Sequence, residues 1–393
     1  MISVETALNI LKTNISPSIK SEVKPVLQAV NHVLFKDISS PISMPPFAQS
    51  AMDGFAVCLH DKLSYQVIDE VKAGDNHEPK LKKGEAIRIF TGAPVPETAN
   101  AVIMQEKVQV NDTIIKLDSS VNSGLNIRHI GEQVKQGDIA LKKGTKLTAA
   151  SIGFLSSLGI TEVSVYKKPS IAILATGNEL VEAGEKLAFG QIYESNSVML
   201  NTALNNLGFT KTSVYKVDDD YANTYNKLKI ILNNHDIVLI SGGISVGDYD
   251  FVGKVLKELK VNQLFYKVKQ KPGKPLYFGK KDTKTIFALP GNPAASLSCF
   301  YIYVYTAIQI ISGDIDFSLN RITAKSESTF NKKGDRAQFL KAIYKNGSVT
   351  ILEGQNSSML HTFALANALV YVPATKNEIL IHEDIEVILL PIN

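Results

Sequence analysis

The stretch DIVLISGG, at residues 236–243, decides the fold of much of this chain. Its run of branched aliphatic residues, bounded by an aspartate and a glycine pair, is typical of a strand that is buried on both faces. The turn SGGISVGDYD, at residues 241–250, leads from it into the helix-like segment DFVGKVLKELK, at 250–260. A buried strand, a glycine-rich turn and an amphipathic helix together form the repeating unit of open parallel sheets.

The same rhythm continues on both sides of this stretch. Further strands are expected at SIAILAT (170–176), TSVYKV (212–217), LFYKV (264–268) and TIFALPG (285–291), and helices at 194–208, 221–234 and from 294 onward. Alternation of this kind predicts a mainly parallel sheet with helices on both faces.

The remaining chain has a different character. Residues 1 to about 40 are expected to form helices, first around residues 7–11 and then around Val26–Val33, because their apolar residues have helical spacing. Residues from about 45 to 140 are rich in glycine, proline and short β-type runs, and the chain after about 318 has short alternating runs. We therefore predict a multidomain α/β plus β protein. Its expected domains are an N-terminal and linker domain (1–44 and 139–168), a β-rich second domain (45–138), an α/β domain (169–318) and a small C-terminal β domain (319–393).

Composition limits the function. The net charge of +4 over 393 residues is too small for a nucleic-acid-binding face. Cys58 and Cys299 lie far apart in no metal-binding spacing, and the N-terminus lacks the pattern of a signal peptide. The apolar segment 294–311 contains serines and three central tyrosines, which favours a buried helix over a membrane span. We expect a cytoplasmic protein without nucleic-acid or membrane partners.

Three of the predicted loops follow carboxyl ends of strands, where open parallel sheets bind ligands. They are TGNEL (176–180), VDDD (217–220) and SGGISVGDYD. Their glycines let backbone amides approach an anion, and their carboxylates are suitable ligands for Mg²⁺. The alternative is that these are ordinary turns with helix-capping aspartates. No Walker P-loop is present, and no GxGxxG motif follows the first strand of the unit.

A cationic stretch follows. Residues 267–284 carry seven lysines against one aspartate, and the turn KPGKP (271–275) is stiffened by its prolines. The segment ALPGNPAAS (288–296) then places a turn directly before a helix, whose first amides are suited to an anion. A solvated basic loop is the alternative. These residues predict phosphoryl or oxyanion chemistry on a nucleotide-like ligand.

Eight motifs in this order resemble a known family. They are PPFAQSAMDGFAV (45–57), IFTGAPVPETANAVIMQE (89–106), IRHIGE (127–132), ATGNEL (175–180), GQIYESN (190–196), SGGISVGDYD, KPGKP and LPGNP (289–293). The chain resembles, from end to end, the MoeA-type molybdopterin molybdenumtransferases, which include the gephyrin E domain.

The resemblance implies an activity and a fold. Such enzymes take adenylylated molybdopterin and molybdate, release AMP in the presence of Mg²⁺, and form the molybdenum cofactor. The implied fold has a MogA/MoaB-like α/β domain, a β-rich second domain, a helical linker domain and a C-terminal β-barrel. A homodimer with its active site across the interface is also implied, and a MogA-type adenylyltransferase is a possible partner. The alternative functions are a MogA-like adenylyltransferase, which the additional domains disfavour, and a non-catalytic gephyrin-like scaffold.

The resemblance also assigns residues. It implies catalytic roles for Asp53, Thr91, Glu179, Asp219, Asp250, Lys267 and Lys271, of which Glu179, Asp219 and Asp250 would hold Mg²⁺. Asp218 and Asp220 stay open as alternatives to Asp219. The implied substrate-binding set is Gly242, Gly243, Ser245, Lys271, Lys274, Pro290, Pro293, Arg336 and Ser357, of which Lys271, Lys274, Arg336 and Ser357 would hold molybdate. The chain departs from the family pattern at Gln133, where an aspartate is usual, and at Ala295, where a serine is frequent.

Overall fold

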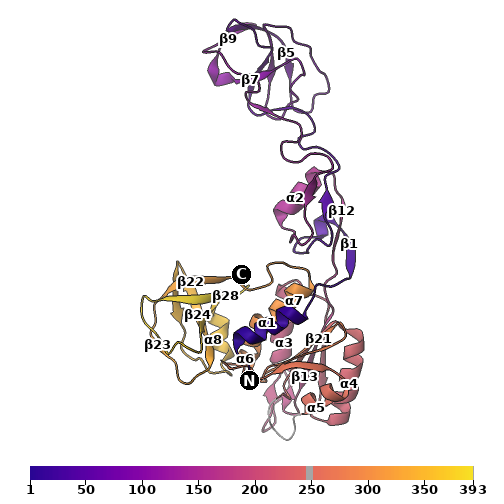
Figure 1. The fold of residues 1–393 in the computed structure, drawn as a ribbon, viewed down its shortest axis with the longest axis vertical. Coiled ribbons are helices and arrows are strands. Elements are labelled where there is room, and N and C mark those ends of the chain that lie inside the picture. Colours follow the sequence, from indigo (N-terminus) through magenta and orange to yellow (C-terminus); the bar gives the residue numbers. More distant parts are fainter. Residues whose placement is uncertain (245–250, 393) are drawn as a thin grey trace. The chain divides into compact units, whose positions relative to one another are not determined.

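A computed structural model describes residues 1–244 and 251–392. The chain divides into two compact units (Figure 1). The first contains Met1–Glu22, Asn31–Val33 and Tyr166–Asn393, and the second contains Val23–Val30 and Leu34–Val165. The finer division into four domains stays a prediction.

The central sheet of the first unit confirms the predicted α/β domain. Its strand order is β16-β13-β17-β21-β20-β18, and the four strands β16, β13, β17 and β21 run parallel. The strands are β13 (Ile171–Thr176), β16 (Thr212–Val217), β17 (Ile237–Ser241), β18 (Asn262–Tyr266), β20 (Tyr277–Lys281) and β21 (Lys284–Leu289). β20 pairs antiparallel with β21, from which only Asp282 and Thr283 separate it, and β18 pairs antiparallel with β20.

Helices cover both faces of this sheet. Ile171 and Ile173 of β13 pack in one core with α3 (Asn196–Asn206), whereas Ala172 and Leu174 pack in another with α4 (Tyr221–Asn234) and α5 (Phe251–Glu258). Side chains alternate between the faces of a strand, so a strand covered on both sides is apolar throughout. All residues of β13 and β17 are buried accordingly.

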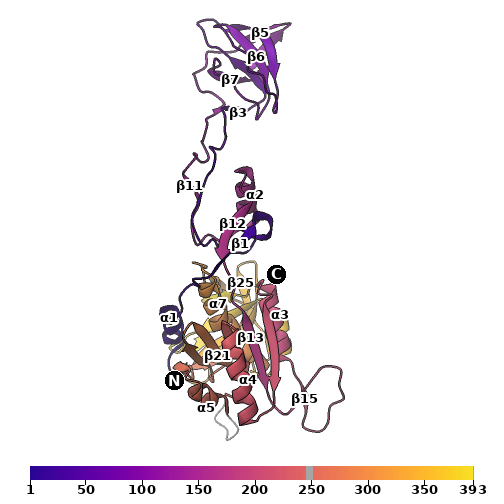
Figure 2. The same ribbon diagram turned by 90° about the vertical axis from the view of Figure 1, so that its right-hand side faces the viewer.

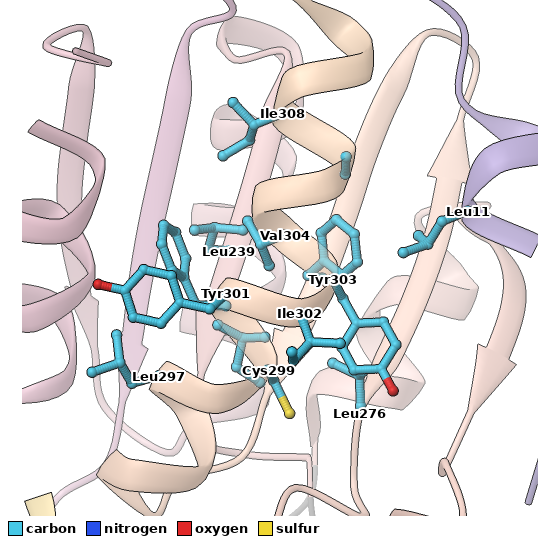
Figure 3. Close-up of a cluster of buried hydrophobic side chains, with 14 of the residues drawn as sticks. Leu11, Leu239, Leu276, Leu297, Cys299, Tyr301, Ile302, Tyr303, Val304 and Ile308 are labelled. Atoms are coloured by element: carbon cyan, nitrogen blue, oxygen red, sulfur yellow. The ribbon is translucent and has the colours of Figure 1, made fainter. Parts of the chain in front are cut away.

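The apolar segment after β21 is a core helix. It consists of α6 (Pro293–Cys299), a π-helical turn (Phe300–Val304) and α7 (Tyr305–Ile311). Within the described residues it is the one helix long and apolar enough to span a membrane, and 94% of it is buried. Figure 3 shows Tyr301 and Tyr303 extending from opposite sides of this helix among Leu276, Leu297 and Ile302.

The C-terminal strands close into a barrel. The ring is β24-β25-β22-β28-β26, and β26 pairs back with β24. The strands are β22 (Arg321–Ser326), β24 (Ala337–Lys345), β25 (Ser348–Ile351), β26 (Ala368–Val372) and β28 (Asp384–Leu389). The short strand β19 (Gln270–Lys271), from the α/β part of the chain, pairs in parallel with β24. The barrel is thereby joined to the cationic turn that follows β19.

The second unit contains the predicted β-rich domain. Its sheet has the order β7-β4-β6-β5-β9-β8. In its central strand β4, Phe55 and Val57 pack on one face and Ala56 on the other, so this strand is apolar on both sides. The linker part contains the helix α2 (Ala149–Ser157) and the pair β1 (Ser21–Pro25) with β12 (Glu162–Tyr166). The sheet strands are β4 (Gly54–Val57), β5 (Ser64–Val71), β6 (Glu85–Ile89), β7 (Ala101–Met104), β8 (Val108–Asn111) and β9 (Ile114–Leu117).

The N-terminal segment differs from its prediction. Residues Val4–Asn14 form the helix α1, capped by Ser3, whose side chain accepts a hydrogen bond from the Thr6 amide. The prediction of a second helix around Val26–Val33 is wrong. Only a 3-10 turn forms there, at Val26–Gln28, and Pro25 immediately before it belongs to β1. Strand pairing between β1 and β12 therefore overrides the local helical spacing.

Candidate active site

A cleft of about 900 Å³ opens at the carboxyl edge of the parallel sheet. The loops after β13, β16, β17 and β21 form one wall, and the C-terminal barrel contributes the other. The short strands β14 (Leu180–Val181) and β15 (Ile192–Tyr193) reach one end of the cleft and lead into a loop that projects from the first unit (Figure 2). Ten predicted residues line the cleft, namely Glu179, Asp219, Gly242, Gly243, Lys271, Lys274, Pro290, Pro293, Arg336 and Ser357.

The glycine pair after β17 is required by the backbone. Gly242 and Gly243 have φ angles of 93° and 61°, which glycine adopts readily. A Cβ atom on Gly242 would also lie 2.7 Å from the carbonyl oxygen of Thr176, and one on Gly243 would lie 3.0 Å from the Thr176 hydroxyl. The turn therefore packs directly on the end of β13 and leaves its open side to the cleft.

Two carboxylates face the cleft from neighbouring loops. Partial burial raises the pKa of Asp219 above its usual value, and the nearby charge of Glu179 raises it further. The Asp219 amide donates to Oδ1 of Asn178 at 2.9 Å, which ties the β16 loop to the β13 loop. Asp220 instead accepts from the Asn223 amide at 2.8 Å and caps α4. Of the three aspartates in VDDD, Asp219 is the one that lines the cleft.

Cationic side chains line the same cleft. Lys271 and Lys274 stand on the KPGKP turn, and Arg336 comes from the loop before β24. Arg336 donates from Nη1 to the Gln270 carbonyl at 3.3 Å, directly before this turn. Across residues 1–244 and 251–392, none of these three cations forms an ion pair, whereas nearby Lys269 pairs with Asp335 at 2.7 Å. Their charge is therefore available to an anionic ligand.

A buried glutamine supports this turn from behind. Gln270 is 1% exposed, and its Nε2 atom donates to the carbonyls of Pro272 and Gly273 at 3.1 and 3.2 Å. Its Oε1 atom accepts from the Tyr303 hydroxyl, which the π-helical turn directs toward it. The sequence predicted a stiff turn for these lysines from its prolines alone. The side chain that organises the turn's carbonyls comes from outside it.

Ser357 connects the barrel to the start of α6. Its carbonyl accepts from the Ala295 amide at 3.1 Å, and its Oγ accepts from Asn292 Nδ2 at 2.8 Å. Ala295 lines the cleft, while Ser296 is buried beside it with an Oγ that has no partner within the described residues. Ser296 thus does not supply the hydroxyl that the family resemblance predicts at the position of Ala295.

Sequence reasoning missed several polar residues of the cleft, among them Thr176 and Asn196. Thr176 Oγ1 and Asn196 Oδ1 are buried polar atoms without a hydrogen-bond partner in the described part of the chain, and both residues line the cleft. Asn196 also donates to Ser241 Oγ and to the Gly291 carbonyl, at 2.9 and 2.7 Å. It thereby joins the β17 and β21 loops. Asn196 is the last residue of the motif GQIYESN, which could have pointed to it. This motif was used only to identify the family resemblance.

The other five predicted residues are not assigned to this cleft, and of these only Lys267 is a described residue of the first unit. Lys267 has a φ of 67° and places its Nζ 4.8 Å from the centre of the Tyr266 ring. Asp53 and Thr91 belong to the second unit. Ser245 and Asp250 lie outside the described residues. The roles assigned to these five residues stay predictions.

Asp53 and Thr91 form a local pair in the second unit. The amide and the hydroxyl of Thr91 both donate to Asp53 Oδ1, at 2.7 Å each. The two hydrogen bonds lower the pKa of Asp53, with the Arg88 charge as a smaller contribution. Both residues are exposed at the ends of β-strands β4 and β6. The pair therefore holds an ionised carboxylate in a fixed position at the surface.

The carboxylates of the cleft are suited to a metal ion that is held partly by the protein and partly by the substrate. Within residues 1–244 and 251–392, no group of three His, Cys, Asp or Glu side chains forms a metal cage. Glu179 and Asp219 both line the cleft, and burial together with the nearby charge of Glu179 raises the pKa of Asp219. Mg²⁺ is commonly held by one or two carboxylates together with water and substrate phosphates. The donor set present fits such an ion.

Comparisons with known proteins cover nearly the whole chain. Residues 2–159 match the MoeA N-terminal region (domain I and II), residues 172–309 a probable molybdopterin binding domain, and residues 323–390 the MoeA C-terminal region (domain IV). A molybdopterin molybdenumtransferase of Haemophilus influenzae is 33% identical over 390 residues, covering 96% of each chain. One from Staphylococcus epidermidis is 34% identical over 359 residues, covering 88% of this chain and 85% of the relative. The structure of a molybdopterin biosynthesis moeA protein from Pyrococcus horikoshii OT3 superposes with a TM-score of 0.87 at 30% identity, covering 99% of this chain and 100% of that one.

Proposed function

Because this chain belongs to the MoeA family of molybdopterin molybdenumtransferases, we propose that it inserts molybdate into adenylylated molybdopterin and releases AMP. The observation that carries the proposal is the cleft, in which carboxylates on one wall face lysines and an arginine on another. Its volume of about 900 Å³ lies within the range of pockets that hold nucleotide-sized ligands. An anionic phosphoanhydride and an oxyanion are the chemistry to which this charge pattern is suited.

The glycine pair and the carboxylates are proposed to receive the pyrophosphate. Gly242 and Gly243 let the backbone approach phosphate oxygens closely, and Glu179 and Asp219 would hold Mg²⁺ beside them. When bound, Mg²⁺ neutralises charge that develops on phosphate oxygens as a phosphoanhydride is cleaved. Lys271, which also lines the cleft, would stabilise the same charge. Asp250 would complete the set of metal ligands.

Molybdate is proposed to bind nearer the barrel. Lys271, Lys274, Arg336 and Ser357 line that side of the cleft. Because Ser357 Oγ accepts from Asn292, its hydroxyl proton is left to donate to a ligand. A tetrahedral dianion needs several donors and positive charge, which these side chains supply together. The same chemistry admits tungstate.

We also propose a cytoplasmic homodimer. In this arrangement Asp53 and Thr91 of one subunit complete the cleft of its partner, and a MogA-type adenylyltransferase supplies the adenylylated substrate. The support is the family resemblance together with the exposed Asp53–Thr91 pair, whose hydrogen bonds hold a carboxylate in a fixed position.

One assay tests the proposed activity. The protein is mixed with adenylylated molybdopterin, Mg²⁺ and molybdate, and both AMP and active cofactor are measured. Release of AMP with formation of active cofactor is expected. Consumption of ATP with unadenylylated molybdopterin would instead indicate an adenylyltransferase, and neither reaction would indicate a scaffold.

Lys274→Ala is expected to weaken the use of molybdate selectively. Removing one charge-assisted donor from an oxyanion site costs about 1.5–3 kcal/mol, which corresponds to an increase of about 10- to 100-fold in half-saturating molybdate. Binding of adenylylated molybdopterin should change far less. The measurement is AMP release and cofactor formation at a series of molybdate concentrations.

Lys281→Ala is the matched control for this variant. Lys281 belongs to the same basic stretch but does not line the cleft. The Lys281→Ala variant removes the same charge and should leave the half-saturating concentration of molybdate unchanged. Equal weakening of both substrates by Lys274→Ala would show that the turn serves one shared phosphate site.

A further inference from the structure

A buried lysine lies behind the barrel wall of the cleft. Lys341 stands on β24 and is 2% exposed. Its Nζ donates to the carbonyls of Gly354, Asn356 and Met359 at 2.8, 3.3 and 3.1 Å. Three acceptors require three N–H donors, which only the protonated ammonium supplies. Burying a cation without a carboxylate is unfavourable unless these dipoles replace its water shell.

The loop that Lys341 holds is the part of the barrel that reaches the cleft. Gln355, Asn356, Ser357 and Ser358 all line the cleft. The Gln355 side chain fixes the same loop to β24, because its Oε1 accepts from the Lys341 amide and its Nε2 donates to the Lys341 carbonyl, both at 2.9 Å. The loop is thus attached to one residue of β24 through both side chain and backbone.

The orientation of the carbonyls determines the orientation of the next amides. In a planar trans peptide the C=O and the following N–H point in opposite directions. The carbonyls of Gly354 and Asn356 point to Lys341, so the N–H groups of Gln355 and Ser357 point away from it. Neither amide donates to an acceptor within residues 1–244 and 251–392, although both residues line the cleft.

We infer that Lys341 is a positioning residue, which directs the backbone N–H groups of Gln355 and Ser357 into the cleft as donors to the oxyanion. Adjacent free amides of this kind form an anion-binding concavity. With the Ser357 hydroxyl they add neutral donors to the charged groups of Lys271, Lys274 and Arg336, which line the same side of the cleft. The identity of the oxyanion as molybdate rests on the proposed function, whereas the orientation of the loop does not.

The barrel offers a matched control. Lys332 is 8% exposed and donates from Nζ to the Ala374 carbonyl at 2.6 Å, on a loop that does not line the cleft. Lys332→Met and Lys341→Met each remove one buried ammonium from the same barrel. A general loss of barrel stability affects both variants, whereas a loss of amide orientation in the cleft affects only Lys341→Met.

Two measurements on the full-length protein test the inference. Hydrogen exchange without ligand should be at least about tenfold faster for the amides of Ala295, Met359 and Leu360 in Lys341→Met, because these amides donate to the carbonyls of Ser357, Asn356 and Ser358 in the loop that Lys341 holds. Molybdate affinity, measured by calorimetry without turnover, should fall about tenfold, since each donor to a charged group contributes on that scale. Lys332→Met should match the wild type in both the hydrogen-exchange rates and the molybdate affinity.

The conservative variant Lys341→Arg separates charge from geometry. Arginine keeps the charge but presents a planar fork, so partial retention is expected, with molybdate affinity between those of the wild type and Lys341→Met. If Lys341→Met does not fold, the same two measurements on Lys341→Arg test the inference. Wild-type affinity in Lys341→Met, or equal losses in the two methionine variants, would overturn the inference. Absence of AMP release by the wild type would overturn the proposed function alone, because neither measurement requires turnover.

Discussion

Asp219→Asn is expected to lower the rate of AMP release about 10²- to 10³-fold while the protein remains fully folded. Loss of one carboxylate ligand removes transition-state stabilisation by the metal, and each tenfold loss in rate corresponds to about 1.36 kcal/mol. The half-saturating concentration of Mg²⁺ should rise in parallel. Of the two other described carboxylates that line the cleft, Glu179 remains, whereas Glu194 already accepts hydrogen bonds from the amide and hydroxyl of Ser197. The measurement is AMP release over a series of Mg²⁺ concentrations.

The two neighbouring aspartates provide the controls. Asp218→Asn and Asp220→Asn change the same charge within the same loop. Asp220 caps α4 through the Asn223 amide, a role that asparagine also fills, so its variant should keep its stability as well as its activity. Near-normal AMP release by Asp219→Asn, at ordinary Mg²⁺ concentrations, would eliminate the metal role.

The stability of Asp219→Asn should move in the opposite direction to its activity. Burial and the Glu179 charge raise the pKa of Asp219 in the folded protein above its unfolded value. In the window between these two values the folded state binds more protons, so stability falls as the pH rises through it. At neutral pH the ionised carboxylate is therefore unfavourable, and asparagine relieves the repulsion. Without Mg²⁺ the variant should unfold at the same or a higher temperature than the wild type.

Mg²⁺ should reverse this order. An ion that binds only the folded state stabilises it by mass action, and the wild type should gain more than the variant. Thermal unfolding with and without Mg²⁺ measures both effects. A variant that is less stable than the wild type without Mg²⁺ would indicate that Asp219 is a structural residue.

The second large effect concerns the dimer. Asp53→Ala and Lys271→Ala are each expected to be nearly inactive as homodimers, whereas a mixed dimer regains roughly half of the wild-type activity. If the site combines Asp53 of one subunit with Lys271 of the other, one cleft of the mixed dimer carries both defects and the other carries neither. Closed two-fold symmetry makes the two clefts equivalent in the wild type, which sets the expected fraction.

The experiment uses differently tagged subunits that are co-expressed and purified as the heterodimer, and AMP release is measured. A matched control is the mixed dimer of Lys271→Ala with Asp219→Asn. These two residues line the same cleft of one chain, so each cleft keeps one defect and no activity should return. A folded but inactive Asp53/Lys271 heterodimer would contradict a site across the interface and leave Asp53 acting within its own subunit.

Much of the cleft was predictable because its residues follow strand ends. Glu179, Asp219 and the Gly242–Gly243 pair come directly after β13, β16 and β17, and carboxyl ends of parallel strands meet at one edge. The choice among Asp218, Asp219 and Asp220 was not predictable. The three aspartates are chemically identical and differ only in where their side chains point. That depends on the residues at which β16 ends and α4 begins.

The sequence by itself determined the alternation of strands and helices, the buried character of residues 294–311 and the strand-end carboxylates. Each of these depends on periodicity or on neighbours a few residues apart. Only the tertiary structure decided that Gln270 supports the KPGKP turn through Tyr303, that Lys267 lies outside the cleft, and that Lys341 holds the loop 354–359. A buried polar side chain takes its partners from whatever packing brings near it, and such partners leave no local pattern in the chain.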